Sequence, residues 1–262
     1  MKIKFYKYQG TGNDFIMLDG RNKNFVIPSE KLINQLCHRQ FGIGADGLIA
    51  IIKNTKYDFE MLYYNADGKA GSMCGNGGRC TIAFAKKLGL IKNQCKFIAY
   101  DGLHEGKIDT KNNVVNLKMN DVQGIKTHGK DLELNTGSPH YVVFKKNIKQ
   151  IDVFNEGKKI RYNNTYQKLG INVNFVEIVN NHLKVRTYER GVENETLSCG
   201  TGVTAAAIAY ANKEKTKKKY QIKIHTPGGK LSVNFKTSDH KLFTEIYLSG
   251  PATMVYQGEI SI

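Results

Sequence analysis

Two stretches decide the organisation of this 262-residue sequence: Cys74-Gly75-Asn76-Gly77 and Cys199-Gly200-Thr201-Gly202. Each starts with a cysteine at the end of a polar loop and is followed by an alanine-containing run, residues 78–88 and 203–212 respectively. Both runs have a high helix propensity and are closed by a glycine or an asparagine, residues that commonly stop a helix. We therefore expect each cysteine to lie directly before a helix N-terminus.

A cysteine in that position is suited to acid–base chemistry. The unpaired N–H groups and the positive end of the helix dipole stabilise an anion, which lowers the pKa of a thiol and makes the thiolate a usable base. The alternative for any cysteine is a small buried apolar side chain. We adopt that interpretation for Cys37, Cys80 and Cys95, whereas the repeated loop-to-helix context favours a functional role for Cys74 and Cys199.

The elements around the two cysteines follow the same order. In each half a strand leads into a polar loop, the cysteine, a helix, another strand and a glycine-containing turn. This repetition predicts a duplicated α+β protein with one main helix in each copy, the second copy beginning near Asp121. Two equivalent cysteines would then face each other across the cleft between the copies, a common place for a ligand.

The remaining elements are predicted from apolar alternation and turn residues. A helix is expected within residues 28–39, where Cys37 is a packing residue. The glycine turn 41–47 resembles a phosphate-binding loop only superficially, because no Gly-Lys-Ser/Thr follows it. Strands are predicted at residues 1–8, 48–52, 57–64, 95–100, 141–144, 176–179, 184–188 and 221–225. Strands of an antiparallel sheet are also predicted within residues 107–119, with turns at Asp101-Gly102 and Asn112-Asn113.

Composition limits the class of protein. With 40% hydrophobic residues, the chain can bury one large core or two small ones. No apolar run reaches about 18 residues, and the N-terminal segment lacks the apolar centre of a signal peptide, so we expect a cytoplasmic protein without a membrane partner. The five cysteines are odd in number and include no Cys-x-x-Cys pair, which predicts neither a disulfide framework nor a zinc site.

The net charge of +16 raises the alternative of a basic nucleic-acid-binding protein. The densest basic run, residues 213–219, directly follows the second expected helix, where lysines complement the negative helix end. The other lysines are spread along the chain without the interleaved aromatic residues of a single-strand binder. We therefore favour a solvated surface and expect no nucleic-acid partner.

Two facing thiols could invert a carbon centre. A small amino or hydroxy acid would be held by its carboxylate at the two helix N-termini, and this binding would strengthen as negative charge builds up on loss of the α-proton. One cysteine, as thiolate, would remove the proton from one face, and the other, as thiol, would return a proton to the opposite face. Since the reverse reaction exchanges the roles, each residue must be both acid and base, which thiols can be.

An ordered set of motifs resembles the diaminopimelate epimerase family over nearly the whole chain. The motifs are residues 10–15 (GTGNDF), 42–47 (GIGADG), 65–68 (NADG), 73–80 (MCGNGGRC), 188–191 (YERG) and 199–202 (CGTG). The resemblance implies interconversion of LL- and meso-2,6-diaminopimelate in lysine and peptidoglycan-precursor biosynthesis, without pyridoxal phosphate, another cofactor or a metal. It also implies a homodimer of chains with two pseudo-symmetric domains, each a mixed β-sheet curled around a central α-helix. The domains would be residues 1–120 with the last strand, 251–262, and residues 121–250.

The same resemblance implies roles for individual residues. Cys74 and Cys199 would be the catalytic acid/base pair, and Glu189 and His140 would orient the substrate and tune the site. The residues that would hold the reacting carboxylate are Gly75, Asn76, Gly200 and Thr201. The residues that would hold the distal amino acid centre are Asn13, Asn65, Asn172 and Arg190, with Glu189 also contacting substrate.

Two positions depart from the family pattern. Gly47 stands where the family often has a glutamine, and Ser138 where it often has an asparagine. Any contact at position 47 must therefore come from the backbone, from water or from another residue. A racemase or epimerase of another amino acid, such as histidine or proline, is the alternative on the same fold. Retention of Asn65, Asn172 and Arg190 favours a substrate with a second amino acid end.

Overall fold

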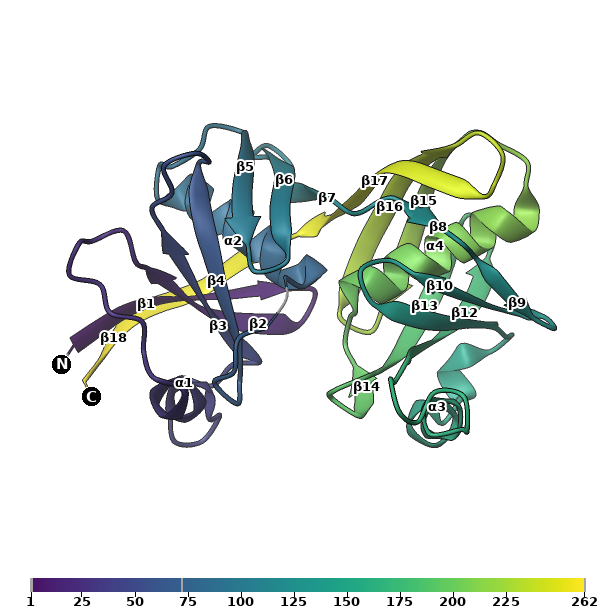
Figure 1. Cartoon of the computed structure of the whole chain (residues 1–262), viewed down its shortest axis with the longest axis horizontal. Helices are drawn as coiled ribbons and strands as arrows, with labels where there is room; N and C mark the ends of the chain where they lie inside the picture. The colour runs from purple at the N-terminus through teal and green to yellow at the C-terminus, as the bar shows by residue number, and fades with distance from the viewer. Residues whose placement is uncertain (1, 72, 262) are drawn as a thin grey trace. The chain divides into compact units, whose positions relative to one another are not determined.

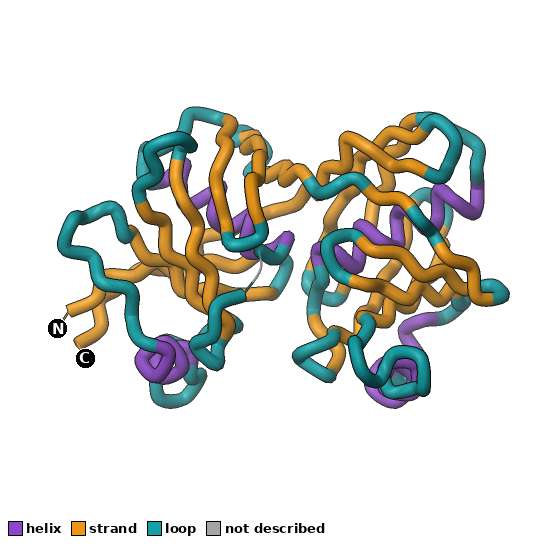
Figure 2. The backbone as a smooth tube through the Cα atoms, viewed as in Figure 1, coloured by secondary structure: helices purple, strands orange, loops and turns teal. Residues whose placement is uncertain are grey.

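The computed structural model describes residues 2–71 and 73–261. The chain divides into two compact units, one formed by Met1–Leu117 with Gly250–Ile262 and the other by Lys118–Ser249. Strands make up most of each unit, and each contains one long buried helix (Figures 1 and 2). The predicted α+β fold class is confirmed.

The first unit is a mixed β-sheet. Its parallel pairs are β2 with β3 and β4 with β5, and its other neighbours are antiparallel. The last strand, β18, pairs antiparallel with the first, β1. The elements are β1 (Lys2–Gly10), β2 (Asn13–Asp19), α1 (Glu30–Cys37), β3 (Gly47–Ile52), β4 (Phe59–Asn65), α2 (Gly75–Lys87), β5 (Gln94–Ala99), β6 (Gly102–Asp109), β7 (Val114–Lys118) and β18 (Thr253–Ser261).

Helix α2 lies at the centre of this unit. It contacts β1, β2, β3, β6 and β18, and every residue from 75 to 85 is buried. Glycine, alanine and other small residues let strands approach it on several sides, which a helix with one polar face could not allow. The helix begins after Cys74, its N-cap, and Gly89 follows its end with a left-handed φ of 71°. Both ends of the predicted helix are thus confirmed.

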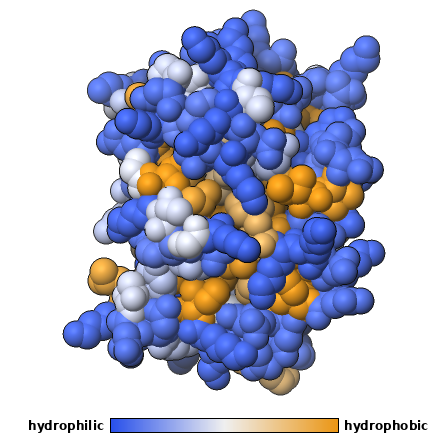
Figure 3. Space-filling model, turned by 90° about the vertical axis from the view of Figure 1, so that its right-hand side faces the viewer, coloured by the Kyte–Doolittle hydropathy of each residue, from blue (hydrophilic) through white to orange (hydrophobic). Residues whose placement is uncertain are grey.

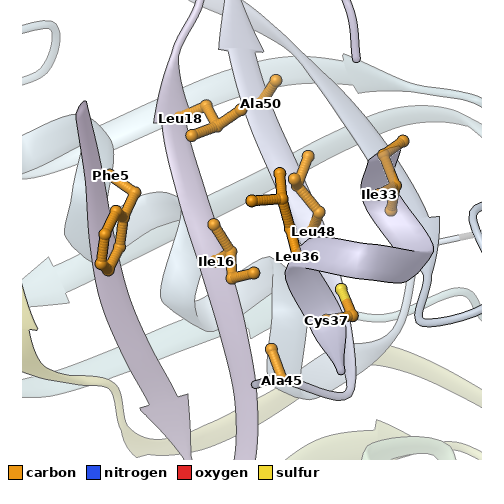
Figure 4. Packing of buried hydrophobic residues seen from close by; sticks show 9 residues of the cluster. All are labelled: Phe5, Ile16, Leu18, Ile33, Leu36, Cys37, Ala45, Leu48 and Ala50. Carbon is orange, nitrogen blue, oxygen red and sulfur yellow. The ribbon is translucent and has the colours of Figure 1, made fainter. Parts of the chain in front are cut away.

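Helix α1 packs on the other side of β2 and β3. Ser29 caps it by accepting a hydrogen bond from the Leu32 backbone N–H, and its apolar side chains join a cluster with the two strands. Cys37 lies in this cluster, so its interpretation as a packing residue is confirmed. Figure 4 shows the buried members: Phe5, Ile16, Leu18, Ile33, Leu36, Cys37, Ala45, Leu48 and Ala50.

The second unit is also a mixed sheet, with parallel pairs between β11 and β12 and between β13 and β15. Its long helix, α4, contacts β10, β11, β12, β13, β15 and β16. The elements are β8 (Val122–Gln123), β9 (Lys126–His128), β10 (Asp131–Asn135), β11 (Pro139–Phe144), η1 (Ile148–Gln150), α3 (Val153–Arg161), β12 (Asn172–Val179), β13 (His182–Glu189), β14 (Asn194–Thr196), α4 (Gly200–Glu214), β15 (Lys219–Thr226), β16 (Gly229–Thr237) and β17 (Leu242–Pro251).

Helix α4 begins as predicted and ends later than predicted. Cys199 is its N-cap, but the expected stop at Asn212 is wrong: the helix continues to Glu214, and Lys215 takes the left-handed conformation with φ 51°. The Asn212 side chain instead donates to the backbone carbonyl of His240. A tertiary contact therefore uses the residue that the sequence suggested as a helix stop.

The surface in Figure 3 is mostly hydrophilic, with hydrophobic residues in separate patches. Within residues 2–71 and 73–261, no helix has the length and apolar character needed to span a bilayer.

Helix α3 was not predicted from the sequence. Asp152 caps it by accepting a hydrogen bond from the Asn155 backbone N–H, and the helix packs on β12 and β13. Gly157 lies at the contact, where an added Cβ would come 2.4 Å from the Cβ of Tyr188. This close approach holds α3 against the strand that ends in Glu189.

Replacing Gly157 with alanine is expected to destabilise the fold by about 1–3 kcal/mol, because the overpacking outweighs the helix propensity of alanine. Urea unfolding monitored by circular dichroism measures the change. The matched control is Lys158→Ala, at the exposed neighbouring position, which should stay within about 0.5 kcal/mol of wild type. A Gly157→Ala variant as stable as wild type would contradict the close packing.

Candidate functional site

In the first unit, the Cys74 sulfur lies within the first turn of α2. Its Sγ accepts a hydrogen bond from the Gly77 backbone N–H at 3.1 Å. A Cβ at position 77 would lie 3.2 Å from that sulfur, so the glycine gives the sulfur access to the helix end. A negative charge on Cys74 would face N–H groups that have no partner inside the helix.

Asn13 and Asn76 lie beside this sulfur. Asn13 Oδ1 accepts a hydrogen bond from Asn76 Nδ2 at 3.2 Å and is 3.8 Å from Cys74 Sγ. Asn13 Nδ2 donates to Asp46 Oδ2 at 2.7 Å, and Arg39 binds the other oxygen of Asp46 at 2.7 Å. Asp46 therefore fixes the direction of the Asn13 carbonyl. The sequence placed Asp46 in the glycine turn 41–47 and did not predict this contact with Asn13.

The neighbouring Asp14 ties the same loops together with charge. Its carboxylate binds Lys7 at 2.7 Å and Arg39 at 2.9 Å. Burial raises the pKa of Asp14, but the hydrogen bonds and charges of these two cations outweigh it and hold the pKa at about 2. The carboxylate is therefore ionised throughout the physiological range and anchors the turn that carries Asn13.

A buried cation stands behind the first turn of α2. Arg79 is fully buried and donates to Gly75 O at 3.2 Å, to Asn76 Oδ1 and Thr11 Oγ1 at 3.1 Å each, and to Pro251 O at 3.4 Å. Burial lowers its pKa to about 10, so it stays charged at neutral pH. No carboxylate in the described part of the chain pairs with it. Its charge adds to the positive end of the helix.

The loop that leads to Cys74 is fixed from the β5–β6 turn. Asp101 Oδ1 accepts hydrogen bonds from the Met73 backbone N–H at 3.2 Å and from His104 Nε2 at 3.1 Å. Burial raises the pKa of Asp101, but the His104 interaction outweighs it and the pKa is lowered. The residue immediately before Cys74 is thus held by a charged side chain that the sequence did not reveal.

In the second unit, Cys199 occupies the equivalent N-cap position of α4 and is buried. Its Sγ lies 3.4 Å from Thr201 Oγ1, and the carbonyl of Thr201 accepts a hydrogen bond from Thr136 Oγ1 at 2.8 Å. At Gly202 an added Cβ would come 2.4 Å from Asn174 Oδ1. The start of α4 therefore rests directly on the Asn174 side chain.

Asn174 orients His140. Thr187 Oγ1 donates to Asn174 Oδ1 at 2.9 Å, so Asn174 Nδ2 is the donor toward His140 Nδ1, 3.0 Å away. Burial, together with the charge of Arg190, lowers the pKa of His140 to about 3, and the ring is neutral at pH 7. Its proton therefore sits on Nε2, for which no described residue is a hydrogen-bond partner. His140 can donate from Nε2 but cannot accept a proton there.

The predicted distal residues of this unit form one cluster. Asn172 Nδ2 donates to Ser138 Oγ at 2.8 Å and to Pro139 O at 3.0 Å, and Asn172 Oδ1 accepts from the Arg190 backbone N–H at 2.9 Å. The Arg190 side chain donates to Leu169 O at 3.0 Å. Ser138, one of the two departures from the family pattern, thus retains a hydrogen bond to Asn172.

The other predicted residues lie at strand ends. Glu189 is the last residue of β13, where its carboxylate accepts from Thr196 Oγ1 at 2.8 Å. Asn65 is the last residue of β4 and pairs with Gly47 of β3. Gly75 and Gly200 are the first helical residues after the two cysteines. Each unit therefore carries one half of the candidate site, here called a half-site. In the first unit it lies around Cys74 at the start of α2, and in the second unit around Cys199 at the start of α4.

Several participants were not identified from the sequence. Asn174 stands two residues after Asn172 on β12, and side chains two apart share a face of a strand. That alternation was the available signal. Asp46 and Asp101 contact residues 33 and 28 positions away in the chain, and no local pattern marks these contacts. Thr187 contacts Asn174 across the neighbouring strands β13 and β12. Among residues 2–71 and 73–261, no cluster of histidine, cysteine, aspartate and glutamate could hold a metal ion.

Comparison with known proteins shows matches along the full chain. The family model described as diaminopimelate epimerase matches residues 5–124 and 133–255. The diaminopimelate epimerase of Flavobacterium psychrophilum is 51% identical over 259 residues, covering 98% of this chain and 100% of that protein. The diaminopimelate epimerase of Aquifex aeolicus is 35% identical over 277 residues, covering 99% and 98% respectively.

Two solved structures share the fold at low sequence identity. A PhzF-family phenazine biosynthesis protein from Bacillus anthracis superimposes with a TM-score of 0.78 at 14% identity, covering 100% of both chains. A hydroxyproline epimerase from Agrobacterium vitis, solved with bound trans-4-hydroxy-L-proline, gives 0.70 at 11% identity, covering 100% of this chain and 93% of that one.

The neutral state of His140 predicts a pH dependence of stability. Its folded pKa of about 3 lies below the ordinary 6.5, so as the pH falls below 6.5 the unfolded chain takes up a proton that the folded chain does not. This lowers the free energy of unfolding by about 1.4 kcal/mol per pH unit until the pH approaches the folded pKa. Between pH 7 and pH 5, wild type should lose about 2 kcal/mol more than His140→Gln.

Urea unfolding at the two pH values measures this difference, and the exposed His38→Gln variant is the control. Equal pH dependence in wild type and His140→Gln would mean that the folded protein protonates His140.

Proposed function

The chain belongs to the diaminopimelate epimerase family, and from this membership we propose that it interconverts LL- and meso-2,6-diaminopimelate in lysine and peptidoglycan-precursor biosynthesis. The observation that carries the proposal is the placement of both cysteines as N-cap residues of the buried helices α2 and α4. The enzyme would act as a cytoplasmic homodimer without pyridoxal phosphate or a metal, and a reducing compartment would keep both thiols available.

The proposed reaction is a two-base inversion at one α-carbon. The thiolate of one cysteine takes the α-proton, so that a C–H bond breaks and an S–H bond forms. The thiol of the other gives its proton to the opposite face, forming the new C–H bond and leaving a thiolate. Cys74 and Cys199 would exchange these roles between the two directions.

The helix ends would stabilise the charge that develops during this transfer. The reacting carboxylate would bind the N–H groups at Gly75 and Asn76 of α2 and at Gly200 and Thr201 of α4, and it gains negative charge as the α-proton leaves. Fixed backbone donors need no reorganisation at that moment. Arg79, charged and buried behind the first turn of α2, would add to this stabilisation.

The remaining residues would orient the substrate. His140 would act as a neutral Nε2–H donor, since Nδ1 already accepts from Asn174. Glu189 would face the ammonium group. The distal amino acid centre would be held by Asn13, Asn65, Asn172 and Arg190, with the Arg190 guanidinium on the carboxylate. Binding of this distal amino acid centre would distinguish diaminopimelate from proline and histidine, which lack it.

Incubation of the enzyme with LL-diaminopimelate in D2O tests the proposal. Meso product should form with deuterium at the inverted α-carbon, because the returning proton comes from a thiol that exchanges with solvent. Mass spectrometry and chiral chromatography together report label and configuration. L-Proline and L-histidine serve as comparison substrates and should not turn over. A preference for either over LL-diaminopimelate would refute the substrate assignment.

Substitution of the cysteines tests the two-base mechanism. Cys74→Ser and Cys199→Ser should each lower the epimerisation rate by about 10²–10⁴-fold, because a hydroxyl is too weak an acid to exchange roles. Either variant should retain elimination of HX from a halogenated diaminopimelate, which needs only one base. Cys37→Ala, in the packed cluster under α1, is the control and should keep near wild-type kcat. Near wild-type epimerisation by either serine variant would end the two-thiol account.

A further inference from the structure

Gly47 has no room for a side chain. It lies in β3 between Phe15 of β2 and Asn65 of β4. A Cβ at position 47 would come 2.5 Å from the carbonyl oxygen of Tyr64 and 2.8 Å from Cε2 of Tyr63. The ring of Tyr63 therefore fills the space that a side chain at position 47 would need.

The Tyr63 ring lies on the side of the sheet that faces the first turn of α2. It packs edge-on against Phe15, with ring centroids 6.0 Å apart. A Cβ built at Gly77, in the first turn of α2, would be 3.5 Å from Cζ of Phe15. On the loop toward Cys74, a Cβ at Gly71 would be 2.8 Å from the Tyr63 ring. The half-buried Tyr63 ring is thus in contact with elements around Cys74.

The hydroxyl of Tyr63 sets the orientation of Asn65. Tyr63 and Asn65 are two residues apart on β4 and share one face of the strand. The phenol donates a hydrogen bond to Asn65 Oδ1 at 2.9 Å. With its carbonyl oxygen bound in this way, Asn65 presents the Nδ2 donor, which suits a carboxylate oxygen and repels an ammonium group. Gly71 leaves this donor open, because a Cβ there would come 3.1 Å from Nδ2.

We propose that Tyr63 takes the place of a side chain at position 47 as a positioning residue, and that it fixes Asn65 so that the amide donates to the distal carboxylate of the substrate. The inference rests on the proposed function and assigns a substrate-specificity role to a residue outside the sequence-predicted site. It also accounts for Gly47: a larger residue there would displace the ring that orients Asn65.

Tyr63→Phe removes the hydroxyl and keeps the ring. The KM for LL-diaminopimelate should rise by about threefold to tenfold, the effect of losing one hydrogen bond, because Asn65 can then turn its carbonyl toward the substrate. The kcat should stay within about twofold, since the reacting centre is unchanged, and the Tm should not move. A merely structural role would lower the Tm or the active fraction and leave KM unaltered.

Tyr64→Phe is the matched control. Tyr64 is the next residue of β4, and its side chain packs into the cluster under α1, on the opposite face. KM and kcat of this variant should equal those of wild type. An unchanged KM in Tyr63→Phe, or a loss confined to kcat, would overturn the proposal.

A competitive ligand identifies the group that Asn65 binds. 2-Aminopimelate has the distal carboxylate and lacks the distal ammonium, so its Ki should rise in Tyr63→Phe by the same factor as the KM. An unchanged Ki alongside a raised KM would place Asn65 on the ammonium and overturn the carboxylate assignment.

Gly47→Ala provides a second, independent test. It should raise KM in the wild-type background by displacing Tyr63, and add little in the Tyr63→Phe background, where the hydroxyl is already gone. Fully additive effects of the two substitutions on KM would count against Tyr63 as the link between position 47 and Asn65. If Gly47→Ala does not fold, the KM of Tyr63→Phe decides the proposal alone. Failure of wild type to turn over LL-diaminopimelate would defeat the proposed function, whereas an active wild type with an unaffected Tyr63→Phe variant would defeat only this inference.

Discussion

A buried guanidinium fixes the place of Cys74 in the first unit. Arg79 joins three segments, the turn at Thr11, the first turn of α2 and the chain at Pro251, through hydrogen bonds to backbone and side-chain oxygens. Removing such a charge from water is costly, and here neutral acceptors rather than a carboxylate offset that cost. The positive charge is therefore not neutralised within the described residues, and it remains effective at the helix end beside the thiol. The same residue therefore holds these segments together and places a positive charge beside the start of α2.

The two half-sites share a backbone plan and differ in their side chains. Both cysteines precede Gly-x-Gly at the start of a buried helix, yet Cys74 lies beside the amides of Asn13 and Asn76 while Cys199 lies beside the hydroxyl of Thr201. Beside the start of α4, Asn174 holds a neutral His140, whereas the charged Arg79 lies behind the start of α2. Both units present a helix end that suits a carboxylate, and the groups behind it differ, which gives the two thiols different surroundings.

Local patterns in the sequence were sufficient for the parts that depend on local structure. The Cys-Gly-x-Gly stretches predicted both helix starts, and Gly89 marked the end of α2, because caps and stops are properties of a few adjacent residues. The sequence did not predict helix α3, because Gly157 weakens the helical pattern of residues 153–161. The close contact between Gly157 and Tyr188 explains why a glycine stands there. Hydrogen bonds between segments far apart in the chain, such as those from Asn13 to Asp46 and from Met73 to Asp101, leave no local trace. The side chain of Tyr63 over Gly47 likewise became evident only in three dimensions.

The pairing of β18 with β1 has a consequence for synthesis on the ribosome. Residues 253–261 complete the sheet that residues 2–10 begin, and Pro251 supplies one of the acceptors of Arg79. The first unit therefore stays incomplete until residues 253–261 have left the ribosome, whereas the second unit is the continuous segment 118–249, which can assemble earlier. Contacts between segments that are so far apart in the sequence form slowly during folding. During translation, the start of α2 therefore remains incomplete, with Arg79 still exposed to water, until β18 has been made.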